Sequence, residues 1–359
     1  MVNSTPNPIK EYYIAYFDIL GYKEFFKQQP ERVPELLNAI HDAVKRTNAH
    51  IGIANQSPLM QDVGNIDIHI KIFSDNILLC LEVLDSPVEP VRVLTFLKIV
   101  ADIQRGFVTE YGLIVRGGIK KGALSFNEDY VFGQGLIDVV AMEEGAQFPR
   151  IVIAPDLLAF LQQNHFYSQE AHQKAVAIEK KLNDKESVSS EEQAFYSQIL
   201  FQTQVFWITQ KALLLLTFQW PDGNWILCYL NQANASTLFG EAAKSSLMQL
   251  LQTTSPSDFQ LLSLPAQDFD AVLQLHKTRV EEQLRKYGSN SDIATGDTKA
   301  AELREKILRK HIWVMAFHNF ICDLYQKPEH KILTRCNCDT RFLKMTIEVL
   351  NDETGIQAN

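Results

Sequence analysis

The pattern of apolar and polar residues in the first third of the chain is typical of buried and half-buried strands. Residues 12–17 form a continuous apolar and aromatic run, which predicts a strand buried on both faces that stops at Asp18. Residues 66–72 alternate strictly and predict a strand with one buried face. The turn residues 74–76 separate that run from another at 77–83, so the two runs predict a hairpin with Asp75 at its tip.

Helical spacing alternates with further strand-like runs up to about residue 155. Gly21 marks a tight turn before a short helical stretch at 22–27. Longer helices are predicted at 90–111 and 133–146, and further strands at 113–119, 122–126 and 150–154. This order of elements predicts an α+β fold, with helices covering one face of an antiparallel-rich sheet.

The remainder of the chain is predicted to be an extension of a few strands and several helices. Residues 180–193 are rich in charged residues and serine, which indicates a solvated linker or a surface insertion. Two strand-like runs within 205–229 are separated by the turn residues 221–224. Residues from 255 onward are mostly helical, with a break at 289–298 and a long helix at 300–325 whose apolar second half should be buried.

Composition narrows the function classes. The chain has 359 residues, 46% of them hydrophobic, which suits a globular protein with one large or two modest cores. A formal net charge of −9 argues against a general nucleic-acid binder. The start of the chain lacks the layout of a signal peptide, and the longest apolar stretches, such as 212–218, are too short to cross a membrane. A cytoplasmic protein without a disulfide framework is expected, since the cysteines number five.

Asp18 and Asp75 are the residues whose predicted positions suggest chemistry. One ends a buried strand and the other lies at a hairpin tip, so on neighbouring strands their carboxylates would converge. Two such aspartates with a backbone carbonyl are suitable hard-oxygen ligands for Mg²⁺ or Mn²⁺. Taken singly, Asp18 is better explained as a helix cap and Asp75 as a turn residue, so the metal site depends on the two residues together.

Four segments in order resemble the motifs of class III nucleotidyl cyclases. They are residues 17–26 and 71–75, which resemble the two metal motifs, residues 115–122, and residues 132–146. Ser74 stands where the family usually has glycine. The resemblance implies a class III nucleotidyl cyclase-type sheet with a ferredoxin-like core, forming a catalytic domain over residues 1–155.

Residues 306–319 and 148–151 further resemble the bacterial Pycsar anti-phage cyclases. Membership would imply formation of cyclic CMP or cyclic UMP from CTP or UTP, and a product that acts on a separate effector. It would also imply a homodimer with its sites between subunits. Residues 156–359 would then be a mostly helical extension that packs on the core and the dimer.

The same resemblance assigns roles to individual residues. Asp18, Asp75 and the Ile19 carbonyl would hold two ions, Mg²⁺ or Mn²⁺. The turn at Gly21, Tyr22 and Lys23 would contact the phosphates. His69 and Tyr130 stand where purine-specific members place their base-reading residues, which favours a pyrimidine, although each is equally well a strand or turn residue.

One departure from the family concerns the charge that assists the reaction. Purine cyclases carry an asparagine and an arginine one helical turn apart, and Asp138 and Met142 fall nearest those positions. Another cation would have to replace the arginine. The candidates are Arg116, which we favour, and Lys23, Lys121 and Arg150.

Two other clusters have simpler explanations. Cys336, Cys338, His330 and Cys322 lack the usual Cys-x-x-Cys spacing of zinc sites, so zinc is not expected. His318 and Asn319 on a buried helix are expected to make core hydrogen bonds. Two alternatives to a pyrimidine cyclase stay open, namely a purine cyclase and a nucleotide-binding scaffold that has lost its activity.

Overall fold

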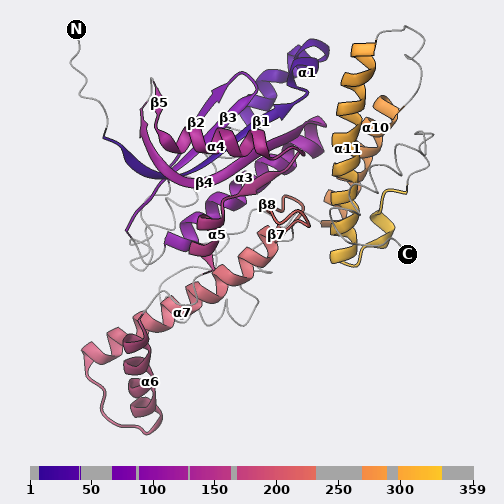
Figure 1. Ribbon diagram of the computed structural model, residues 1–359. Coiled ribbons are helices and arrows are strands. Elements are labelled where there is room, and N and C mark those ends of the chain that lie inside the picture. Colours follow the sequence, from indigo (N-terminus) through magenta and orange to yellow (C-terminus); the bar gives the residue numbers. More distant parts are fainter. Residues whose placement is uncertain are drawn as a thin grey trace, which may run out of the picture.

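The computed structural model describes residues 8–39, 41, 67–85, 89–127, 130–162, 168–231, 269–288 and 298–333 (Figure 1). An eight-stranded sheet lies at its centre, in the order β2-β3-β1-β4-β6-β8-β7, with β5 paired to β4. The strands are β1 (Lys10–Leu20), β2 (Ile68–Phe73), β3 (Asn76–Glu82), β4 (Ile114–Phe126), β5 (Val131–Phe132), β6 (Ile151–Ile153), β7 (Thr217–Gln219) and β8 (Trp225–Leu227).

The first four long strands form a ferredoxin-like core. The chain runs from β1 through α1 (Tyr22–Gln28) and the short turn η1 (Pro30–Arg32) to the β2–β3 hairpin, then through α3 (Glu89–Tyr111) to β4. Strands β2, β3, β1 and β4 lie side by side in that order, and each neighbouring pair is antiparallel. This is the split β-α-β arrangement. The predicted α+β class and ferredoxin-like core are therefore confirmed.

Strand β1 separates two layers because its side chains alternate between the faces of the sheet. Tyr13, Ala15 and Phe17 join the large core that contains α3 and α5 (Pro155–Leu161). This is the main helical layer, on one face as predicted. Tyr12 and Ile14 point to the other face, where they pack with the single helix α4 (Gln134–Gly145).

Two glycines of β4 let α4 approach the sheet closely. A Cβ on Gly122 would lie 2.7 Å from the Cα of Gly135, and one on Gly118 would lie 2.7 Å from the Cβ of Met142. Two strands were expected at 113–119 and 122–126, but β4 is continuous from Ile114 to Phe126. Gly122 lies within this strand and serves helix packing.

The extension continues the sheet and surrounds it with helices. Strand β8 pairs with β6 and β7 pairs with β8, so residues from both predicted domains share one sheet. Helices α10 (Phe269–Gly288) and α11 (Thr298–Leu324) pack on one another, and the short helix η5 (Pro328–His330) follows α11. The predicted domain division near residue 155 stays a prediction.

Residues 180–193 do not form a linker, because they lie in α6 (Gln169–Asn183), the following turn and the start of α7 (Ser190–Leu216). They are mostly exposed, which agrees with the alternative of a surface insertion. Ser189 caps α7 in a capping box with Glu192, and Lys181 pairs with Glu192 at 2.6 Å.

The prediction of two strands around the turn residues 221–224 is confirmed in part. Strands β7 and β8 pair across this turn, but residues 205–216 belong to α7. Among the described residues no helix is long and apolar enough to cross a membrane.

Candidate active site

Asp18 and Asp75 meet where β1 ends beside the β2–β3 hairpin. Asp18 lies opposite Asn76 in the register of β1 and β3, and the Ile19 backbone N–H donates to the Asp75 carbonyl at 2.8 Å. Both aspartates are partly buried. The hairpin tip is thus tied by its backbone to the strand that carries Asp18, as the sequence predicted.

A hydrogen bond and a turn conformation define this end of the hairpin. The Tyr16 hydroxyl, on the same face of β1 as Asp18, donates to the Asn76 side-chain oxygen at 2.7 Å. Ser74 has a φ of 61°, whereas Asp75 is not among the residues with positive φ, as in a type II′ turn that favours glycine at its first position. A serine therefore holds a conformation that suits the glycine found in the cyclase motif.

Arg116 lies directly across the sheet from Asp18. The two are opposite in the register of β1 and β4, so their side chains emerge on the same face. The Arg116 Nε donates to Glu143 of α4 at 2.5 Å, and its Nη2 contacts the same carboxylate. Arg116 is therefore close to the aspartates but is engaged by a carboxylate of α4.

The charges around Asp18 do not balance. Burial raises the pKa of the Asp18 carboxyl, and the charges of Asp75 and Glu143 raise it further, while Arg116 and Lys310 lower it. A cation is what this arrangement lacks, so the donor set suits a divalent ion bound by Asp18 and Asp75. Lys310 was not predicted from the sequence as part of this site, because α11 lies far from Asp18 along the chain.

The turn after β1 contains the residues proposed to contact phosphates, and that role stays a prediction. Gly21 has a φ of 85° and is the N-cap of α1, and its carbonyl accepts from the N–H groups of Glu24 and Phe25. The Tyr22 ring packs against Phe26 with centroids 6.2 Å apart. Lys23 is exposed on this short helix.

The proposed base-reading residues do not lie beside the aspartates of the same subunit. His69 is opposite Cys80, which is opposite Ile14, four residues along β1 from Asp18, or about 13 Å at roughly 3.3 Å per residue. Its ring stacks on Phe126 at 4.9 Å, just before the turn that contains Tyr130. Figure 1 shows the β5 hairpin and α1 at opposite ends of the sheet.

The remaining cation candidates face elsewhere. Arg150 is 3% exposed and is committed to Asp222 and the Ala146 carbonyl, which ties β6 to the β7–β8 turn. Lys121 is opposite Tyr13 and so belongs to the other face of the sheet. Of the four candidates, Arg116 alone lies opposite Asp18.

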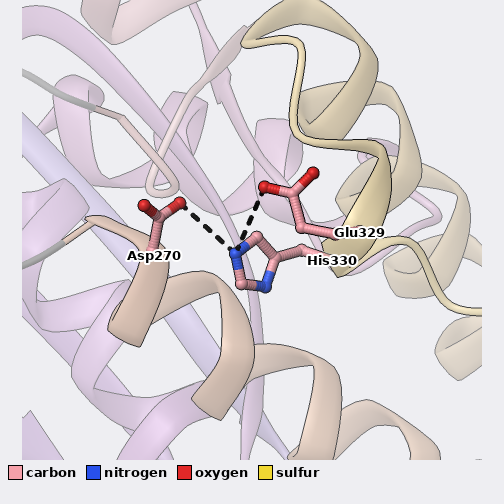
Figure 2. Close-up of side chains that lie close together, drawn as sticks. All are labelled: Asp270, Glu329 and His330. Carbon is pink, nitrogen blue, oxygen red and sulfur yellow. Dashed lines mark ion pairs between the residues drawn. The ribbon is translucent and has the colours of Figure 1, made fainter.

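A second cluster of possible metal ligands lies between α10 and η5. Figure 2 shows the His330 Nε2 between the carboxylates of Asp270 and Glu329, at 3.3 Å and 3.9 Å. Lys327 lies 2.8 Å and 2.9 Å from the two Asp270 oxygens. Because that ammonium already neutralises the carboxylate, these contacts form an ion-pair cluster that joins the start of α10 to η5.

The remaining residues considered from the sequence are His318 and Asn319 and the cysteines near the end of the chain. His318 and Asn319 make core hydrogen bonds, as predicted: Asn319 pairs with the backbone of Ile332 at 2.8 Å and 3.2 Å. Cys322 is buried, and its sulfur lies 3.5 Å from the His318 Nε2. Cys336 and Cys338 lie outside the described residues.

No family model and no curated protein matches this chain. Among solved structures it is similar to the adenylyl cyclase CyaB from P. aeruginosa, with 13% identity, a TM-score of 0.32, and 45% of this chain and 85% of that chain covered. A class III adenylyl cyclase-like ATP-binding protein from Pseudomonas aeruginosa has 10% identity and a TM-score of 0.28, with 45% of this chain and 37% of that chain covered. A bacterial light-regulated adenylyl cyclase has 14% identity and a TM-score of 0.30, with 44% of this chain and 82% of that chain covered. Likenesses this distant carry no argument about function.

Proposed function

We propose that this chain is a nucleotide cyclase that converts CTP or UTP to the 3′,5′-cyclic monophosphate and pyrophosphate. The observation that carries the proposal is the meeting of Asp18 and Asp75, joined by the Ile19 N–H···Asp75 O bond, with Arg116 opposite Asp18. The charge imbalance around Asp18 favours an ion-binding role over the simpler cap and turn explanations.

In this proposal Asp18, Asp75 and the Ile19 carbonyl hold two divalent ions, Mg²⁺ or Mn²⁺. When bound, the ions neutralise phosphate charge and help the ribose 3′-oxygen to attack the α-phosphorus. Tyr16 and Asn76 position the hairpin. The turn at Gly21, Tyr22 and Lys23 contacts the phosphates, and Arg116 adds positive charge beside them.

We further propose that the working unit is a symmetric homodimer with two equivalent sites. His69 and Tyr130 lie away from Asp18 of their own subunit, so they would read the base bound to the partner's metal end. Phe132 and Ile137, beside and on α4, are 69% and 62% exposed, which supports an interface on that face. Sedimentation of the purified protein measures the mass of the particle in solution, and twice the 40.9 kDa mass of one chain is expected.

The substrate class and cellular role come from the resemblance to Pycsar cyclases. His69 and Tyr130 replace the purine-reading residues, which favours a pyrimidine base. We propose that the product signals phage infection to a separate effector protein in the cytoplasm. Neither CTP nor UTP is favoured over the other, because they differ mainly at one exocyclic group.

The test is an assay of the purified protein with each of the four nucleoside triphosphates and Mn²⁺, with chromatographic separation of products. A cyclic pyrimidine product is expected, and Asp75→Ala should reduce its rate by at least about a hundredfold. Asp85→Ala, which removes an exposed carboxylate on the same segment, is the matched control and should leave the rate unchanged. A cyclic purine as the main product would reject the pyrimidine assignment.

A nucleotide-binding scaffold is the second candidate, and contacts of α4 favour it. Asp138 is held by Lys120 at 2.5 Å, and Met142 packs against Gly118, so the two positions nearest the family's asparagine and arginine serve structure. Triphosphate binding without any cyclic product would identify this second function.

A further inference from the structure

Helix α11 brings one lysine to the charged end of the sheet. Lys310 is half-buried, and the charges of Arg116, Asp18 and Glu143 all act on it. Burial, followed by Arg116, lowers its pKa. Figure 1 shows α11 standing beside the end of the sheet where α1 begins. The extension therefore reaches the proposed site within one subunit.

Packing on both sides fixes the helix that carries Lys310. Trp313, one helical turn later and 1% exposed, stacks on Phe148 with centroids 6.1 Å apart and on Trp220 at 5.2 Å. Phe148 follows α4, the helix that carries Glu143. On the side toward α10, His311 stacks on Tyr287 at 5.5 Å. Because residues three apart share a helix face, Lys310 lies on the face of α11 on which Trp313 contacts Phe148.

Lys310 differs from Arg116 in its ion pairing. Arg116 is bound by Glu143, whereas Lys310 makes no ion pair within 4 Å among the described residues. The half-buried Lys310 ammonium therefore lies near the carboxylates of Asp18 and Glu143. A metal ion bound at Asp18 would neutralise part of that negative charge. On its flexible stem the ammonium acts as a point charge that reaches phosphate oxygens.

We propose that Lys310 binds the triphosphate of the nucleotide and supplies positive charge that Asp138 and Met142 do not provide. This inference rests on the proposed function, since it places a phosphate chain at Asp18 and Asp75. It gives the extension a direct part in the site: α11 contributes a substrate-binding residue to the subunit that also holds the metal ions.

The experiment measures the binding of inorganic tripolyphosphate, CTP and CMP in the presence of Mn²⁺. Tripolyphosphate carries the phosphate charges without a base, so the result does not depend on base choice. Lys310→Met, which keeps the stem and removes the charge, should weaken tripolyphosphate and CTP binding by about tenfold or more. CMP, with a single phosphate, should lose far less, and Lys310→Arg should restore most of the affinity.

Arg309→Ala is the matched control, because it removes the same charge from the next residue. Arg309 pairs with Glu305 at 2.7 Å on the exposed side of α11, and its loss should not change binding. Equal weakening of CMP and CTP, or unchanged tripolyphosphate binding by a folded Lys310→Met protein, would overturn the role of Lys310 alone. A wild-type protein that binds none of the three ligands would reject the proposed function and this inference together.

Discussion

Helix α11 contributes to two clusters of polar side chains, one made of charged groups and one made of neutral hydrogen-bonded groups. Near its middle, Lys310 lies among Asp18, Glu143 and Arg116, where charges remain unbalanced. Two turns later, His318 joins a chain of neutral groups with His276 and Tyr229. The neutral chain is fully buried, whereas Asp18 and Lys310 are only partly buried, so charge is kept in the cluster that is nearer to solvent.

The hydrogen-bond directions of the histidine chain follow from its last acceptor. The His318 Nε2 lies 2.9 Å from the His330 carbonyl, which only accepts, so this nitrogen carries the proton. The His318 Nδ1 then accepts from the His276 Nδ1–H at 3.0 Å, and the His276 Nε2 accepts from the Tyr229 hydroxyl at 3.0 Å. Every member is satisfied without charge, which is the pattern of a structural network.

The largest expected effect on stability concerns Arg116. Arg116→Ala leaves the Glu143 carboxylate, 7% exposed, buried without its partner. The free energy of unfolding should fall by about 3 kcal/mol, measured by urea denaturation. The double variant Arg116→Ala/Glu143→Gln removes the uncompensated charge and should recover more than half of the loss. If it is no more stable than the single variant, the Arg116–Glu143 pair does not hold α4 on the sheet.

Removing the charge of Asp18 should have two opposite consequences. A raised pKa means that folding disfavours the ionised carboxyl, so Asp18→Asn should raise the stability of the metal-free protein at neutral pH. Mn²⁺ at a hundred times its Kd should stabilise the wild type by about 2.7 kcal/mol and the variant hardly at all. Thermal unfolding with and without Mn²⁺ measures both. Equal stabilisation of the two proteins would place the ion elsewhere, for example at Asp270, Glu329 and His330.

The sequence predicted the places of Asp18 and Asp75 in the sheet because the signals are local. An apolar run that stops at Asp18 and a turn around Asp75 each depend on a few neighbouring residues. Lys310 and Glu143 could not be found in this way, since their positions depend on how α11 and α4 pack on the sheet. The break predicted between strands 113–119 and 122–126 was wrong for a related reason: the glycines of β4 allow close contact with α4, as Gly122 does with Gly135.

We expect the protein to lose stability in acid because it buries neutral histidines. Burial lowers the pKa of His311 to about 4, below its ordinary value of about 6.5. Between these values the unfolded chain binds more protons than the folded one, so stability is complete above about pH 6.5 and falls as the pH drops toward 4. From pH 6.5 to 5, His311 alone should cost about 2 kcal/mol.

The variant His311→Gln tests this assignment by urea denaturation at pH 7 and pH 5. It should lose less stability than the wild type over that interval, while the exposed His172→Gln serves as the control and should follow the wild type. A pH dependence identical in all three proteins would show that His311 does not titrate with unfolding.

The smallest expected effect compares two strained positions, one before Asp75 and one after α11. Ser74 beside Asp75 and Gln326 after α11 have φ values of 61° and 54°. Ser74→Gly and Gln326→Gly each relieve about 1 kcal/mol of strain and lose part of it to the greater freedom of the unfolded chain, so each should gain about 0.5 kcal/mol. Ser74 lies next to a proposed metal ligand and Gln326 does not, so Mn²⁺ affinity should change in Ser74→Gly alone. An equal change in both variants, measured by Mn²⁺ titration, would mean that ion binding depends on overall stability and not on the hairpin at Asp75.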